Sequence, residues 1–65
     1  MKAYQIIGEA VQERGITCSE LARRIGVSAE IMRRCLSGER KIGADEFVAL
    51  CRELDLSIAD FQKVA

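Results

Sequence analysis

Basic side chains are concentrated in one stretch of the chain. Residues 23 to 41 hold six arginines and lysines against two glutamates, whereas the whole sequence of 65 residues has a net charge of zero. Arg33 and Arg34 are adjacent, and Arg40 and Lys41 follow them closely. Arginine can donate two parallel hydrogen bonds to a guanine edge, and both residue types bind phosphate oxygens. Two adjacent arginines taken alone are more typical of a solvated helix face, so the elements that position this stretch decide whether it indicates contacts with double-stranded DNA.

The sequence offers little for catalysis or metal binding. Histidine is absent, and the three widely spaced cysteines, Cys18, Cys35 and Cys51, fit neither a disulfide framework nor a zinc site. No glycine-rich phosphate loop and no nucleophile with a neighbouring base can be recognised. We therefore expect no enzymatic activity, no cofactor, no metal and no small-molecule ligand. Cys35 and Cys51 are expected to be small buried hydrophobes.

Short helices must position the basic residues. The chain has no proline, and glycines and small polar residues divide it into segments with helical spacing of apolar residues. Thr17 followed by Glu20 predicts a capping box, and Ser28 predicts the cap of the next helix. The expected fold is one compact all-α domain over residues 1–65 with five helices, at about 3–14, 17–25, 28–37, 44–54 and 57–64.

The last two helices are expected to complete the core. The fourth should bury Phe47, Val48, Cys51 and Leu54, which recur at helical spacing. The fifth should cover the open end of the core with an apolar face that consists of Ile58, Phe61 and Val64.

The second and third helices are separated by three residues, Gly26, Val27 and Ser28. Two helices joined by a short glycine-containing turn form a helix-turn-helix, whose second helix enters the major groove. The third helix is expected to turn Met32, Cys35 and Leu36 inward and its charged residues outward.

Several short motifs resemble the phage repressor and Cro helix-turn-helix family, also called the XRE class. The resemblance spans nearly the whole chain and implies a lambda-repressor-like fold of five helices that binds operator DNA, typically as a dimer. The stretch of residues 38–47 further resembles small prophage-type regulators. The motifs are Gly15-Ile16-Thr17, Glu20-Leu21-Ala22, Ile25-Gly26-Val27-Ser28, Gly38-Glu39-Arg40-Lys41 and Leu54-Asp55-Leu56-Ser57.

The resemblance also implies which residues meet DNA. Family members reach base edges or nearby phosphates from the positions of Ala29, Glu30, Arg33 and Arg34. Arginine suits guanine, glutamate can accept from cytosine, and alanine can touch a thymine methyl. Arg33 is the main candidate for reading bases.

Phosphate contacts are expected from Arg34, Arg40 and Lys41, and from the helix-start amides capped by Thr17 and Ser28. Cys18 stands where the family usually places a glutamine that holds a phosphate. A cysteine in the first turn of a helix can also be reactive, and redox control is one interpretation. We favour the other interpretation, a small side chain that is merely tolerated there, because no resolving cysteine is close in the sequence.

A second departure from the family concerns Val11 and Leu36, where many members have an arginine and a glutamate that link the first helix to the third. We expect an apolar contact there, an exchange that is often neutral or stabilising.

These features predict a sequence-specific DNA-binding transcriptional regulator, a repressor of phage or mobile-element type, that reads the major groove with the third helix. The alternatives on the same fold are a protein-interaction module, such as an antirepressor or inhibitor partner, and an antitoxin. The neutral net charge and Cys18 favour the protein-interaction module, and an antitoxin would combine DNA binding with protein binding.

Self-association and location complete the expectations. Phe61 and Val64, with Tyr4 or Ile7, could form an apolar patch for a homodimer, and ordinary closure of the core is the alternative. No stretch suggests a signal peptide or a membrane span, so a cytoplasmic location is expected.

Overall fold

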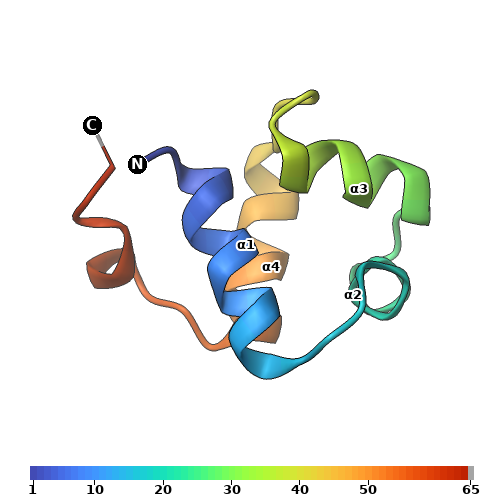
Figure 1. Cartoon of the computed structure of the whole chain (residues 1–65), viewed down its shortest axis with the longest axis horizontal. Helices are drawn as coiled ribbons and strands as arrows, with labels where there is room; N and C mark the ends of the chain where they lie inside the picture. The colour runs from blue at the N-terminus through green and yellow to red at the C-terminus, as the bar shows by residue number, and fades with distance from the viewer. Residues whose placement is uncertain (65) are drawn as a thin grey trace.

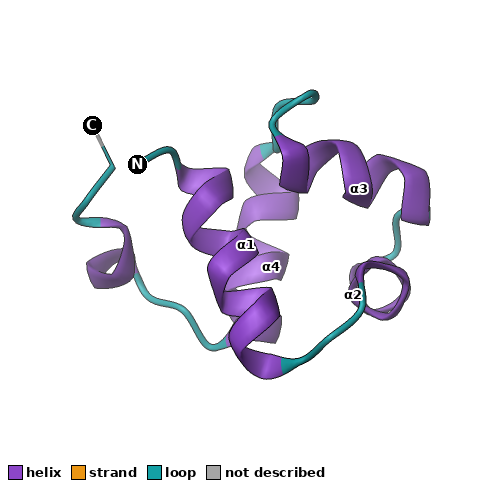
Figure 2. Ribbon diagram, viewed as in Figure 1, coloured by secondary structure: helices purple, strands orange, loops and turns teal. Residues whose placement is uncertain are grey.

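The computed structural model describes residues 1–64 and is all-helical (Figures 1 and 2). Within these residues, four α-helices are followed by one short 3-10 helix, and no strand occurs. The expected all-α fold class is confirmed. The elements are α1 (Ala3–Arg14), α2 (Cys18–Ile25), α3 (Ala29–Ser37), α4 (Ala44–Leu54) and η1 (Ile58–Phe61).

One apolar cluster holds the α-helices together. Each α-helix contributes at least one side chain that is almost completely buried. These side chains are Ile7 of α1, Leu21 of α2, Met32 of α3, and Leu50 and Leu54 of α4. Full burial of such a side chain contributes about 1.5–3 kcal/mol, so these contacts dominate the stability of so small a domain. In Figure 1, α1 and α4 lie at the centre, with α2 and α3 on one side and the C-terminal segment on the other.

Helix ends follow from residues that tolerate a left-handed backbone. Gly26 ends α2 with φ 80° and Gly38 ends α3 with φ 85°, a region that side chains with a Cβ rarely adopt. Asp55 ends α4 with φ 54° and is the only non-glycine residue with positive φ in the range 1–64. The connections before and after α3 are therefore sharp.

The prediction of a fifth α-helix at about residues 57–64 is wrong. Residues 58–61 form only one turn of 3-10 helix, in which Asp60 N donates to Ser57 O at 3.0 Å and Gln62 N donates to Ala59 O at 3.4 Å. Ile58 is 79% exposed, and only Phe61 packs on the core, with its ring centroid 5.0 Å from that of Phe47. A short helix is stable only when an apolar face packs against other elements, and the single packed side chain of Phe61 does not stabilise an α-helix here.

The expected burial also needs correction in α4 and beyond. Val48 is 55% exposed, whereas Leu50, two residues later, is buried. Val64 is 40% exposed and so does not close the core. Ile7 has no exposed surface and cannot belong to a surface patch.

The expected apolar contact between Val11 of α1 and Leu36 of α3 stays a prediction, with which their burial is compatible. Val11 is buried in the core, and Leu36 is half-buried and packs against the same core. Both line a shallow hollow between the two helices. α3 is therefore seated on α1 without an ion pair between these positions.

No helix in the part of the chain that the structure describes is long and apolar enough to cross a membrane. The cytoplasmic location stays a prediction.

Candidate nucleic-acid interface

α2 and α3 form the expected helix-turn-helix, joined by the three residues 26–28. In Figure 2, α2 is seen along its axis while α3 lies across the view, so the two helices cross steeply. Thr17 Oγ1 accepts the amide hydrogen of Glu20, and Ser28 Oγ accepts that of Ile31, each at 3.1 Å. Both helix starts are thus capped and their remaining amides are available to an anion.

Only half of the predicted capping box forms at α2. Glu20 does not return a hydrogen bond to the backbone of Thr17. Its carboxylate instead accepts hydrogen bonds from the guanidinium of Arg23, one helical turn further on. An Arg three residues after a Glu competes for the carboxylate that the box requires.

The predicted site residues lie on α2, on α3 and on the connection that follows. Of the nine, only Cys18 is half-buried, and the exposed ones are Thr17, Ser28, Ala29, Glu30, Arg33, Arg34, Arg40 and Lys41. The structure brings Ala29, Glu30, Arg33 and Arg34 together on the exposed side of α3, opposite the buried Met32 and Cys35. Arg40 and Lys41 follow beyond the end of that helix.

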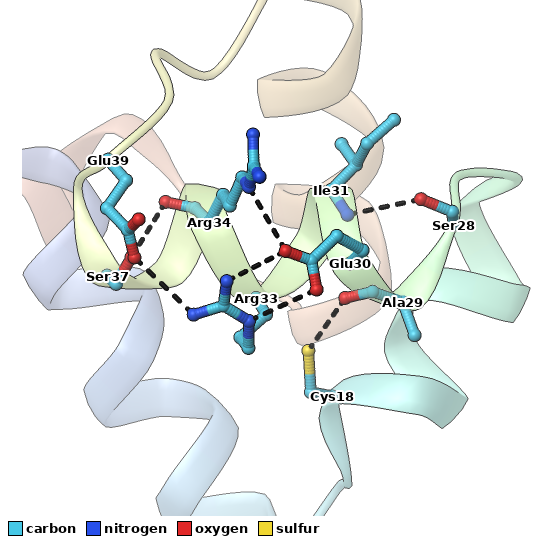
Figure 3. A network of polar contacts seen from close by, with 9 residues as sticks. All are labelled: Cys18, Ser28, Ala29, Glu30, Ile31, Arg33, Arg34, Ser37 and Glu39. Atoms are coloured by element: carbon cyan, nitrogen blue, oxygen red, sulfur yellow. Dashed lines mark hydrogen bonds and ion pairs between the residues drawn. The ribbon is translucent and has the colours of Figure 1, made fainter.

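The charged side chains of α3 form one network (Figure 3). Arg33 Nη2 donates to Glu30 Oε2 at 2.8 Å, and Arg34 Nε donates to the same oxygen at 3.1 Å. Arg33 Nη1 lies 3.4 Å from Glu39 Oε2, which also accepts from Ser37 Oγ at 2.8 Å. The guanidinium of Arg33 is therefore held between two carboxylates, and that of Arg34 is held by Glu30 alone.

The network also shifts protonation equilibria. Hydrogen bonds from Arg33 and then Arg34 lower the pKa of Glu30, so its carboxylate stays charged. The hydrogen bond and charge of Glu30, with the charge of Glu39, raise the pKa of Arg33. Both shifts favour the charged forms of Glu30 and Arg33.

Arg40 turns back onto the protein. Its Nη1 donates to Glu46 Oε1 on α4 at 3.0 Å and lies 3.3 Å from Cys35 Sγ. The hydrogen bond to Glu46 is the main reason that the pKa of Arg40 is raised. Lys41, the next residue, is exposed.

Cys18 connects the two helices of the motif. Its Sγ lies 3.7 Å from the carbonyl oxygen of Ala29, at the start of α3, and the side chain packs against the core. The thiol thus faces α3 in Figure 3. Cys35 is buried as expected, and Cys51 is half-buried, where burial raises the pKa of its thiol. Within residues 1–64 no cluster of three or more cysteine, aspartate or glutamate side chains could hold a metal ion.

Sequence reasoning missed the partners of the arginines. Glu30 stands three and four residues before Arg33 and Arg34, a spacing that favours ion pairs on a helix and is visible in the sequence. The contact between Arg40 and Glu46 joins a loop to the next helix, and only the fold shows it.

The comparisons agree with this geometry. The family model described as a Cro/C1-type HTH DNA-binding domain matches residues 7–64, almost the whole chain. No curated protein and no solved structure matches the chain.

Proposed function

Because the chain belongs to the family of Cro/C1-type helix-turn-helix DNA-binding domains, we propose that this DNA-binding regulator is a sequence-specific, non-enzymatic transcriptional repressor that reads the major groove with α3. The observation that carries the proposal is the shape and chemistry of the motif. α3 is capped, is seated on a buried apolar face, and exposes Ala29, Arg33 and Arg34 side by side on its free face.

Arg33 and Ala29 are the proposed base contacts. Arg33 is in the middle of α3 and has 55% of its side chain exposed, so it can exchange its present carboxylate partners for a guanine edge. Ala29 is in the first turn, where a methyl group can touch thymine.

The remaining site residues are proposed to bind phosphates. Arg34 is exposed on the same face of α3 as Arg33, Lys41 is exposed in the connection that follows α3, and Arg40 becomes available if it leaves Glu46. The amides at the starts of α2 and α3, behind Thr17 and Ser28, add neutral donors. Such contacts set affinity and salt dependence more than sequence preference. Cys18 contributes by joining α2 to α3, and its redox control stays a hypothesis that peroxide treatment before a DNA-binding assay would test.

We also propose that the repressor acts as a homodimer, since the symmetry of operators is usually matched by a dimer. The support is exposed apolar surface on α4 and beyond it, at Val48, Ile58 and Val64. Multi-angle light scattering should give twice the monomer mass for the wild type, and Val48→Glu with Ile58→Glu should give the monomer mass. A monomeric wild type at all concentrations contradicts this part.

The test of DNA binding is fluorescence anisotropy of a labelled random-sequence duplex across a salt series. The wild type should bind, and its affinity should fall steeply with salt, because phosphate contacts release counterions. Arg33→Ala with Arg34→Ala should abolish binding. The matched control is Arg14→Ala with Arg52→Ala, which removes the same charge from the ends of α1 and α4 and should retain most of the affinity.

The second candidate is a protein-interaction module or an antitoxin on the same fold. It is favoured by one observation, the pairing of Arg23, Arg33, Arg34 and Arg40 with carboxylates of the same chain. A folded wild type that does not bind DNA even at low salt would favour this candidate. A partner interface that is mostly apolar would respond little to salt.

A further inference from the structure

Glu30 occupies a position between the two arginines proposed to meet DNA. Its carboxylate accepts from Arg33 Nη2 at 2.8 Å and from Arg34 Nε at 3.1 Å, and one oxygen, Oε2, serves both (Figure 3). A single carboxylate thus holds both guanidinium groups of α3. Its side chain is 58% exposed, so the contact lies on the surface that would face a duplex.

The charges of this surface cancel. Arg33 and Arg34 provide two positive charges, and Glu30 and Glu39, both ion-paired to Arg33, provide two negative charges. When an arginine leaves Glu30 for a phosphate, the free carboxylate remains close to the polyanion. Non-specific binding, which depends almost entirely on phosphate contacts, is therefore weakened most.

The Glu30 carboxylate affects base contacts differently from phosphate contacts. A guanine edge offers Arg33 two aligned acceptors, and a cytosine amino group can donate to the carboxylate that Arg33 has left. Sequences with a G·C pair in reach of α3 can therefore satisfy both partners of the broken ion pair. Other sequences leave the carboxylate without a donor.

We propose that Glu30 is a specificity-determining residue that suppresses binding to non-operator DNA by competing with phosphates for Arg33 and Arg34. The inference rests on the proposed function. It differs from a purely structural role, in which Glu30 stabilises the first turn of α3 through the helix dipole and leaves DNA affinity unchanged.

The test is Glu30→Gln, which keeps the shape of the side chain and removes its charge. The affinity for a labelled random-sequence duplex should rise about threefold or more at about 50 mM salt. The slope of log affinity against log salt should become steeper by about one, because one further phosphate contact is released from competition. The matched control is Glu13→Gln, which makes the same charge change on the exposed face of α1 and should leave the slope unchanged.

A second variant separates pairing from general charge. Within residues 1–64 the Glu39 carboxylate pairs with Arg33, at 3.4 Å, and not with the guanidinium of Arg34, so Glu39→Gln should raise the affinity less than Glu30→Gln. Circular dichroism should show that all variants are folded.

Three outcomes would overturn the inference. If the wild type binds and Glu30→Gln changes affinity and slope no more than Glu13→Gln does, Glu30 has no role in discrimination. If Glu30→Gln weakens binding, the carboxylate holds the arginines ready for DNA rather than away from it. If no folded variant binds a duplex at low salt, the proposed function itself fails, and the inference fails with it.

Discussion

Gly38 fixes the end of α3 through two independent constraints. Its φ of 85° lies in the left-handed region, and a Cβ at this position would lie 2.6 Å from Cζ of the Tyr4 ring. Gly26 ends α2 with a similar φ of 80°, but a Cβ there would meet no atom within 4 Å. At Gly38, unlike at Gly26, the missing Cβ also lets the end of α3 approach Tyr4 at the start of α1.

These two glycines make a matched pair for mutation. Gly26→Ala should lower the free energy of unfolding by about 1–2 kcal/mol, the usual cost of a left-handed backbone with a Cβ. Gly38→Ala should cost at least as much, and any excess over Gly26→Ala measures the cost of moving the Tyr4 ring, whose outer atoms are those that the methyl group would meet. Urea unfolding followed by circular dichroism measures both losses.

Tyr4→Ala provides the control, since it removes the ring that the methyl group would meet. In that background, Gly38→Ala should cost no more than Gly26→Ala does. An equal loss for the two glycine variants in the wild-type background would show that Tyr4 moves aside freely.

At the scale of elements, α3 depends on Ser28, the residue that caps its start. Ser28 Oγ accepts the amide hydrogen of Ile31 and so satisfies one of the free donors at the helix start. α3 has only nine residues and is too short to be stable alone. Its cap and its packing through Met32 and Cys35 therefore determine whether the proposed recognition surface exists.

Ser28→Ala should lower the free energy of unfolding by about 1 kcal/mol, because the Ile31 amide loses its acceptor. Ser28→Asn should be close to the wild type, since asparagine caps as well as serine does. Thermal unfolding monitored at 222 nm compares the three proteins. An alanine variant as stable as the wild type would mean that water satisfies the amide equally well.

The four α-helices were predictable because caps, glycines and apolar spacing all indicate the same boundaries. Ser28 and Gly38, for example, bound α3 in the sequence as in the structure. The fifth helix was wrong because apolar spacing in Ile58, Phe61 and Val64 does not reveal whether a partner surface exists, and only Phe61 finds one.

The positions of the candidate site residues were predictable from the sequence, but the carboxylates with which the arginines pair were not. Exposure of Arg33 and Arg34 follows from their place opposite Met32 on the helix. Their shared partner Glu30 was missed because a glutamate in the first turn of a helix already has an explanation in the helix dipole. The contact of Arg40 with Glu46 depends on how the loop folds back, which no local pattern encodes.

For the whole molecule, a net charge of zero conceals extensive internal pairing. Ion pairs run along α2 and α3 and from the following loop to α4, where Glu46 accepts from Gly43 N at 2.9 Å and from Arg40 Nη1 at 3.0 Å. Glu46 thus caps α4 and ties the basic loop to it. Of these two contacts, the Gly43 amide comes first and Arg40 second in lowering the pKa of Glu46.

The lowered pKa makes stability depend on pH. A carboxyl whose pKa is lower in the folded than in the unfolded state stabilises the fold fully above its ordinary pKa, which is 4.5 here. That stabilisation is lost as the pH falls through the lowered, folded-state value. The urea midpoint of the wild type should therefore decrease between pH 7 and pH values below about 4.

Glu46→Gln should reduce this decrease, because the amide does not titrate yet can still accept from Gly43. Arg40→Gln should reduce it less, since the amide of Gly43, the larger cause of the shift, remains. Urea titrations of all three proteins at both pH values measure the difference. A Glu46→Gln protein with the same pH dependence as the wild type would contradict this assignment.

The short connections between the helices also affect how fast the chain folds. Consecutive α-helices are separated by only three to six residues, and α2 packs on α3, the next helix along the chain, whereas α1 packs on the more distant α3 and α4. Small all-helical domains, whose helices form from local contacts, fold within about microseconds to milliseconds. The sequence has no proline, so slow isomerisation before proline cannot delay the unfolded chain. A molecule that unfolds should therefore regain its proposed recognition surface almost at once, in a single rapid refolding phase.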